Sequence, residues 1–106
     1  MVFYLKRFLP YRRGVGLFIV NDRQQIFVAR RIDTPSSAWQ MPQGGIEKNE
    51  SPEQAVFREM QEEIGTRHGR IIGQSHHWHR YDLPRSLVRK VWGGQFRGQK
   101  QKWFAI

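Results

Sequence analysis

The chain has 106 residues, which sets a limit of one domain, and it is strongly basic. Lys and Arg number 18 against 9 Asp and Glu, for a formal net charge of +9 and a pI near 10.9. Such a surplus attracts nucleic acid, nucleotide polyphosphates or anionic membranes. The absence of cysteine excludes disulfides and thiolate metal sites, and it fits a cytoplasmic protein. Because no run is long enough to cross a bilayer, we expect no membrane partner.

The first half of the chain predicts two paired strands. The continuous apolar run over 14–20 is typical of a buried strand. Turn-forming residues at 21–24 precede a second predicted strand over 25–30, which would form a hairpin with the first. The next predicted elements are a loop over 34–37, a short extended piece over 39–42 and a turn at Gly44-Gly45.

One helix is predicted, and it begins after Ser51. Ser51 is a preferred N-cap, Pro52 suits the first helical position, and Gln54 completes a capping box. Gly65 is placed to end the helix. Three apolar residues at helical spacing predict its buried side: Phe57, Met60 and Ile64. Further strands are predicted over 70–75, 78–83 and 102–106.

Three carboxylates share one face of this helix, offset from its apolar side. At about 100° per residue, Glu59, Glu62 and Glu63 lie within one turn, where like charges repel. A divalent cation would relieve that repulsion, and a set of oxygen ligands suits Mg²⁺ or Mn²⁺. Arg58 stands four residues before Glu62 and can orient its carboxylate. The alternative is a solvated acidic face.

These residues belong to a longer pattern, which runs Gly44-x5-Glu50-x7-Arg58-Glu59-Met60-x-Glu62-Glu63-x-Gly65-Thr66. It resembles the Nudix box, the loop-helix-loop motif of the Nudix hydrolases, here over 44–66. Thr66 departs from the box, which prefers an aliphatic residue at that position. The flanking segments are similar to the branch of RNA pyrophosphohydrolases and dinucleoside polyphosphate hydrolases: residues 11–12, 29–31, 39–46 and 98–104.

The resemblance implies an α+β protein with the Nudix fold, in which a mixed β-sheet lies within an α/β/α sandwich. A single domain would span 1–106. Relatives of this branch continue for about another third of a domain, with more strand, a loop glutamate that often serves as catalytic base, and a C-terminal helix. We therefore expect an incomplete domain that lacks the last strand region and that helix.

The resemblance also assigns roles to individual residues. Catalysis is expected from Arg58, Glu59, Glu62 and Glu63. The three glutamates and the carbonyl of Gly45 would hold Mg²⁺, for which Mn²⁺ or another divalent cation can substitute. The metal would offset phosphate charge and activate water. Substrate binding is expected from Arg12, Arg31, Gln43, Gln99, Lys100 and Lys102.

The substrate follows from the branch and the charge. Metal-dependent hydrolysis of a phosphoanhydride is expected, most simply removal of pyrophosphate from the 5′-triphosphate end of RNA. The basic and aromatic stretch 97–104 suits RNA, because phosphate contact and base stacking both contribute to RNA binding. The same stretch is also compatible with an ordinary strand that buries Trp103 and Phe104. Two alternatives stay open: a dinucleoside polyphosphate hydrolase of the Ap4A type, and a non-catalytic remnant that binds RNA or polyphosphate.

Overall fold

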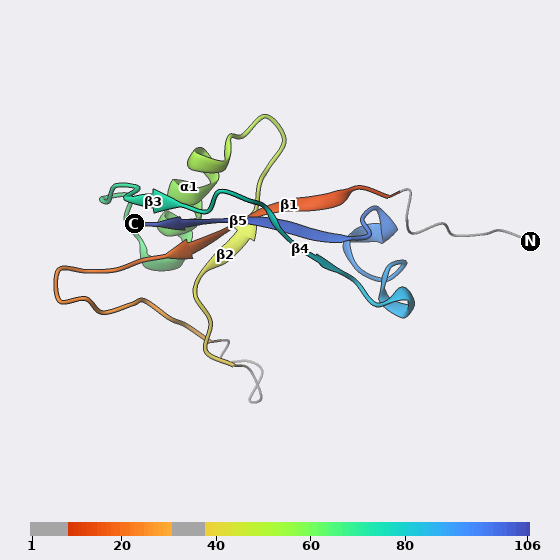
Figure 1. Ribbon diagram of the computed structural model, residues 1–106, viewed down its shortest axis with the longest axis horizontal. Helices are drawn as coiled ribbons and strands as arrows, with labels where there is room; N and C mark the ends of the chain where they lie inside the picture. The colour runs from red at the N-terminus through yellow and green to blue at the C-terminus, as the bar shows by residue number, and fades with distance from the viewer. Residues whose placement is uncertain (1–8, 31–37) are drawn as a thin grey trace, which may run out of the picture.

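A computed structural model describes residues 9–30 and 38–106. In this part of the chain a β-sheet is covered on one face by one α-helix (Figure 1). In chain order the elements are β1 (Tyr11–Phe18), β2 (Gln43–Gly45), α1 (Pro52–Ile64), β3 (Gly73–Gln74), β4 (His79–Asp82), the short 3₁₀ helices η2 (Arg85–Leu87) and η3 (Trp92–Gly94), and β5 (Gly98–Ala105). No helix of the described residues combines the length and the apolar character needed to span a membrane.

The sheet is mixed, as the resemblance implied. Its strand order is β2-β1-β5-β3, and β4 also pairs with β5. The longest ladder joins β1 and β5 in parallel from Tyr11↔Gly98 to Phe18↔Ala105, and the other pairs are antiparallel. The last strand of the chain therefore lies inside the sheet, next to the first. The α+β class and the mixed sheet are confirmed, and α1 is the one α-helical layer of the described residues.

The predicted helix has the predicted bounds. The Ser51 hydroxyl accepts a hydrogen bond from the Gln54 amide at 3.1 Å, and the Gln54 side chain accepts one from the Ser51 amide at 2.8 Å. This reciprocal pair is the capping box. At the other end Gly65 has φ 77°, the left-handed conformation that glycine adopts without steric cost.

The buried side of α1 is only partly the predicted one. Met60 is buried, but Phe57 and Ile64 are half-buried, and the helix instead turns Ala55 and Val56 into the core. Met60 is confirmed and Ile64 packs against the core from its edge, but the stripe is rotated towards Ala55 and Val56, which the prediction did not include. The core cluster consists of seven residues from the helix, the two central strands and the residue after β5: Val15, Leu17, Ala55, Val56, Met60, Phe104 and Ile106.

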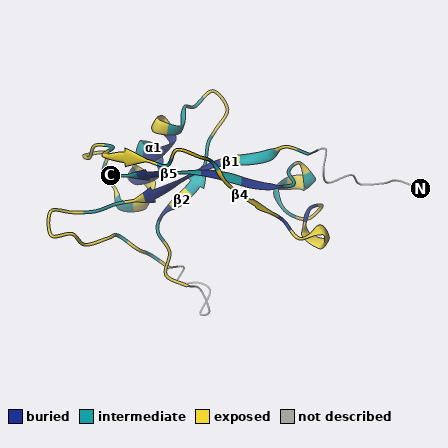
Figure 2. Ribbon diagram, in the orientation of Figure 1, coloured by how far each residue is buried: buried dark blue, intermediate teal, exposed yellow. Residues whose placement is uncertain are grey.

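The predicted strand over 25–30 is wrong. Only isolated bridges join Val20 to Ile26 and Ala29 to Gln40. This segment reaches beyond the sheet and is largely exposed (Figure 2), with Ile26 46% and Val28 44% exposed. An apolar segment forms a strand only where at least one of its faces can be buried, and these residues do not join the core.

The later strands differ from the prediction in length. β1 begins at Tyr11, earlier than the predicted 14–20, because its first residues pair with β5. β5 starts at Gly98, four residues before the predicted start at 102, for the same reason. β3 and β4 are shorter than predicted because each contacts only part of β5.

Candidate active site

Arg58 is the centre of a hydrogen-bonded carboxylate cluster at the start of the predicted Nudix box. Its Nε and Nη2 donate to both carboxylate oxygens of Glu50, at 2.8 and 2.9 Å. Nη2 also donates to the Gly45 carbonyl at 2.7 Å. Nη1 donates to Glu59 at 2.8 Å and, more weakly, to Glu62 at 3.4 Å. One guanidinium thus links the turn, the loop and two turns of α1.

Glu50 is the residue that sequence reasoning undervalued. The expected catalytic and metal-binding residues did not include it, yet its carboxylate receives two hydrogen bonds from Arg58 and one from the amide of Glu47 at 3.0 Å. The bonds from Arg58 lower the pKa of Glu50, so this carboxylate stays ionised. In turn the Glu50 carboxylate raises the pKa of Arg58. The sequence did contain a signal for this ion pair. A glutamate that stands next to a helix N-cap is within reach of an arginine two turns along the helix.

Glu59 is the buried member of the three predicted metal ligands. Only 7% of it is exposed, and its carboxylate packs directly against Gly44 of β2. Burial raises its pKa, the Arg58 hydrogen bond opposes that rise, and the negative charges of Glu62 and Glu63 add to it. The site therefore holds a carboxylate whose charge is poorly compensated, and a cation would stabilise it.

Glu62 and Glu63, unlike Glu59, are exposed. Across residues 9–30 and 38–106, no three acidic or histidine side chains are close enough together to hold a metal ion. The donors nevertheless fit a hard divalent cation in kind, because all are carboxylate oxygens on adjacent turns. The Gly45 carbonyl is already an acceptor for Arg58, which leaves it one lone pair.

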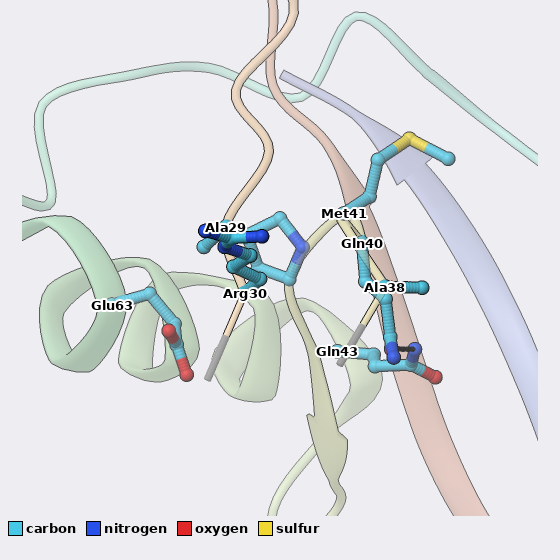
Figure 3. A pocket seen from close by; sticks show the side chains of 8 residues that line it. Ala29, Arg30, Ala38, Gln40, Met41, Gln43 and Glu63 are labelled. Carbon is cyan, nitrogen blue, oxygen red and sulfur yellow. Dashed lines mark hydrogen bonds between the residues drawn. The ribbon is translucent and has the colours of Figure 1, made fainter. Parts of the chain in front are cut away.

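A pocket of about 310 Å³ opens beside α1. Figure 3 shows Glu63 on the helix side and Arg30, Gln40 and Gln43 on the opposite wall. The Gln43 amide donates to Gln40 at 3.1 Å, which fixes its orientation. The predicted substrate residue Gln43 therefore lines the same pocket as a predicted metal ligand. Arg31 lies outside the described residues.

Trp39 is 63% exposed although tryptophan is usually well buried, and the Arg30 guanidinium lies 5.0 Å from its ring centre. The loop that carries it extends past the edge of the sheet and has no core to enter. Arg30 was not singled out from the sequence. The Arg-Arg pair at 30–31 gave no means of deciding which of the two reaches the pocket.

Arg12 and Gln99 are brought together, but on the other face of the sheet from α1. The Arg12 guanidinium lies against the backbone of Gly45 and donates to the Gln99 side chain at 2.7 Å. It also stacks on Trp92, 5.1 Å from the ring centre. Gln99 is buried, and its amide nitrogen donates to Gln101 at 2.8 Å. Both ends of the Gln99 side chain are thus engaged, so it positions Arg12.

Lys100 and Lys102 alternate with Gln99 along β5 and therefore occupy the opposite face, the one that α1 also occupies. The Lys100 ammonium lies 5.2 Å from the ring centre of Trp78. These two lysines are separated from Arg12 by the sheet itself. The described substrate residues of the prediction thus form three groups. Gln43 lies at the pocket, Arg12 and Gln99 lie on the sheet face away from α1, and Lys100 and Lys102 lie along β5 on the α1 face.

Replacing Gly44 by alanine is expected to disrupt the carboxylate cluster. A Cβ at this position would lie 2.1 Å from the Glu59 carboxylate, so the buried side chain must move away from Arg58. We expect weaker divalent-cation binding, measured by calorimetry, with a helical far-UV spectrum close to that of the parent protein. Gly73→Ala is the matched control, because its Cβ would meet only Ala105 at an ordinary 3.9 Å. Equal cation affinity in both variants would contradict this role of Gly44.

The chain is similar to known proteins over most of its length. The RNA pyrophosphohydrolase of Rhodospirillum rubrum is 59% identical over 98 residues, which are 92% of this chain and 59% of that protein. The RNA pyrophosphohydrolase of Rickettsia typhi is also 59% identical, over 92% of this chain and 61% of its own. The chain therefore spans about three-fifths of the length of these curated relatives.

The solved structure of the E. coli dihydroneopterin triphosphate pyrophosphohydrolase has a TM-score of 0.64 at 21% identity, over 92% of this chain and 70% of its own. At this identity the likeness shows the fold alone. The family model for the NUDIX domain matches residues 10–103, a span that includes the whole Arg58-centred cluster. The chain belongs to the Nudix family.

Proposed function

We propose that this chain forms part of a metal-dependent hydrolase that removes pyrophosphate from the 5′-triphosphate end of RNA. The observation that carries the proposal is the cluster in which Arg58 holds Glu50, Glu59 and Glu62 beside the Gly44-Gly45 turn. This half-buried guanidinium gives the carboxylates a fixed frame, which a metal site requires. The names of the two relatives described above support RNA as the substrate.

The cofactor would be a divalent cation, as is general for Nudix hydrolases, and Mg²⁺ suits the donors best. Glu59 would be the fixed ligand. Glu62 and Glu63 are exposed, so their side chains would turn towards the cation when it binds with the phosphate chain. A bound cation would offset phosphate charge and lower the pKa of the attacking water.

The pocket beside Glu63 is suited to the phosphate chain. Arg30 and Gln43 line it and offer cationic and amide donors to phosphate oxygens. Arg12, held by Gln99, would bind a part of the substrate that reaches the other face near Gly45. Water would add to phosphorus as the phosphoanhydride bond breaks, releasing pyrophosphate and leaving a 5′-monophosphate.

The test is direct. The protein is incubated with Mg²⁺ or Mn²⁺ and, separately, with 5′-triphosphate RNA and with diadenosine tetraphosphate. We expect pyrophosphate release and 5′-monophosphate RNA as products. Cleavage of the dinucleotide alone would replace the proposal with the alternative hydrolase. Binding of triphosphate RNA with no release, even with Mn²⁺, would show a non-catalytic binding domain.

A further inference from the structure

We propose that a cationic surface on the α1 side of the sheet binds the body of a single-stranded RNA whose 5′ end is at the carboxylate cluster. This surface consists of six residues from β1, β4, β5 and the residue before β4: Tyr11, Arg13, Trp78, Arg80, Lys100 and Lys102. The inference rests on the proposed function for the location of the 5′ end. The RNA-binding surface itself can be tested without hydrolysis.

Strand register places these residues on one face. Arg13 and Arg80 both pair with Lys100, from the two sides of β5. Cross-strand partners project from the same face of a sheet. The three cations therefore form a row across three strands. In Figure 1, β1 and β5 extend past α1 at the ends where these strands begin. Arg13 and Arg80 are exposed.

The same register connects this surface to the carboxylate cluster. Val15 pairs with Gly44 on one side and with Lys102 on the other. The Glu59 carboxylate packs on that face of Gly44. Because neighbouring strands lie about 4.8 Å apart, Lys102 is about 10 Å across the sheet from Gly44. A short single strand can cover that distance.

Within the described residues, the four cations of the surface are not neutralised by ion pairs. In the described part of the chain, Arg13, Arg80, Lys100 and Lys102 form no salt bridge. The nearby acid, Asp82, accepts hydrogen bonds from the Tyr11 hydroxyl at 2.8 Å and from Arg97 at 3.2 Å. The positive charge therefore remains accessible to a polyanion.

Aromatic rings favour RNA over other polyanions. Lys100 lies 5.2 Å from the Trp78 ring centre, and Arg80 lies 5.5 Å from that of Tyr11. Rings hold these cations in place, and the exposed guanidinium planes of Arg13 and Arg80 can stack on unpaired bases. An anionic membrane would gain from the charges but not from this stacking.

The experiment measures binding of a fluorescent 5′-hydroxyl single-stranded RNA by anisotropy over a range of salt. The double variant Arg13→Gln/Arg80→Gln is compared with Arg23→Gln/Arg67→Gln, which removes equal charge from exposed residues elsewhere. We expect the first pair to weaken binding roughly 10-fold or more and to lower the salt slope by about 1.4, which is about 0.7 for each phosphate that is no longer neutralised. The control pair should change neither.

Because this RNA has no phosphoanhydride, the result does not depend on whether the protein hydrolyses anything. Equal weakening in both variants would mean that net charge alone attracts RNA, and the inference would fail. It would also fail if Arg13→Gln/Arg80→Gln left RNA affinity intact but reduced binding to phosphatidylserine vesicles. Hydrolysis of a nucleoside triphosphate, which is too short to reach the surface, should be unchanged by the variant.

Discussion

Glu62→Gln is expected to lower the rate of pyrophosphate release by at least about 10²-fold, because a ligand charge is removed where phosphate charge must be offset. The Glu62 side chain is 56% exposed and has only a 3.4 Å contact with Arg58. The substitution keeps its shape and removes its charge, so the fold should be unaffected. The rate is measured with 5′-triphosphate RNA and saturating Mg²⁺.

Glu53→Gln is the matched control, because Glu53 is an exposed glutamate in the first turn of the same helix, away from Arg58. It should keep the parental rate. Binding of Mn²⁺, followed by electron paramagnetic resonance, should weaken in Glu62→Gln alone. A near-parental rate for Glu62→Gln would remove this residue from the metal site.

Arg58→Met is expected to destabilise the fold by about 2–3 kcal/mol at neutral pH. It removes the partner of two largely buried carboxylates, whose side chains are 13% exposed in Glu50 and 9% in Glu59. An ionised group left without its partner in such surroundings costs more than the ion pair contributes. Urea unfolding measures the change. Arg67→Met, an exposed arginine just after the helix, is the control and should change little.

This destabilisation should depend on pH in a defined direction. Arg58 lowers the folded-state pKa of Glu50, so the pair stabilises the fold above the unfolded pKa of glutamate, about 4.3. That contribution disappears as pH falls through the lower folded value. In Arg58→Met the unpaired carboxylates take up protons more readily, so the stability difference between the two proteins should shrink in acid. A difference that is constant from neutral pH to pH of about 3 would argue against charge as its cause.

The helix could be predicted from the sequence because its determinants are local. Ser51, Gln54 and Gly65 specify its ends through contacts with their own neighbours. The carboxylate spacing was equally readable, because residues three or four apart share a helix face. What remained hidden depends on distant segments. The inward turn of Glu59 is set by Gly44, and the importance of Glu50 by the path of the loop before the helix.

The strands were harder to predict for the same reason. β5 contains Gln99 and Gln101, which are buried although they are polar, and an apolar pattern cannot reveal a strand of this kind. The Gln99 side chain accepts a hydrogen bond from Arg12 and donates one to Gln101. Conversely, the apolar residues Ile26 and Val28 suggested a strand where the sheet does not reach. Family resemblance predicted a set of site residues, but it could not show that Lys100 and Arg12 lie on opposite faces of the sheet.

The parallel pairing of β1 with β5 has a consequence for folding kinetics. Arg12 and Gln99, which bond across this ladder, are 87 positions apart in the chain. Closing so long a loop costs entropy before the ladder can form. The capped helix can form early, whereas Val15, Leu17 and Phe104 meet only when β1 and β5 come together. In a nascent chain the edge of β1 that faces β5 therefore stays unpaired until β5 has been synthesised.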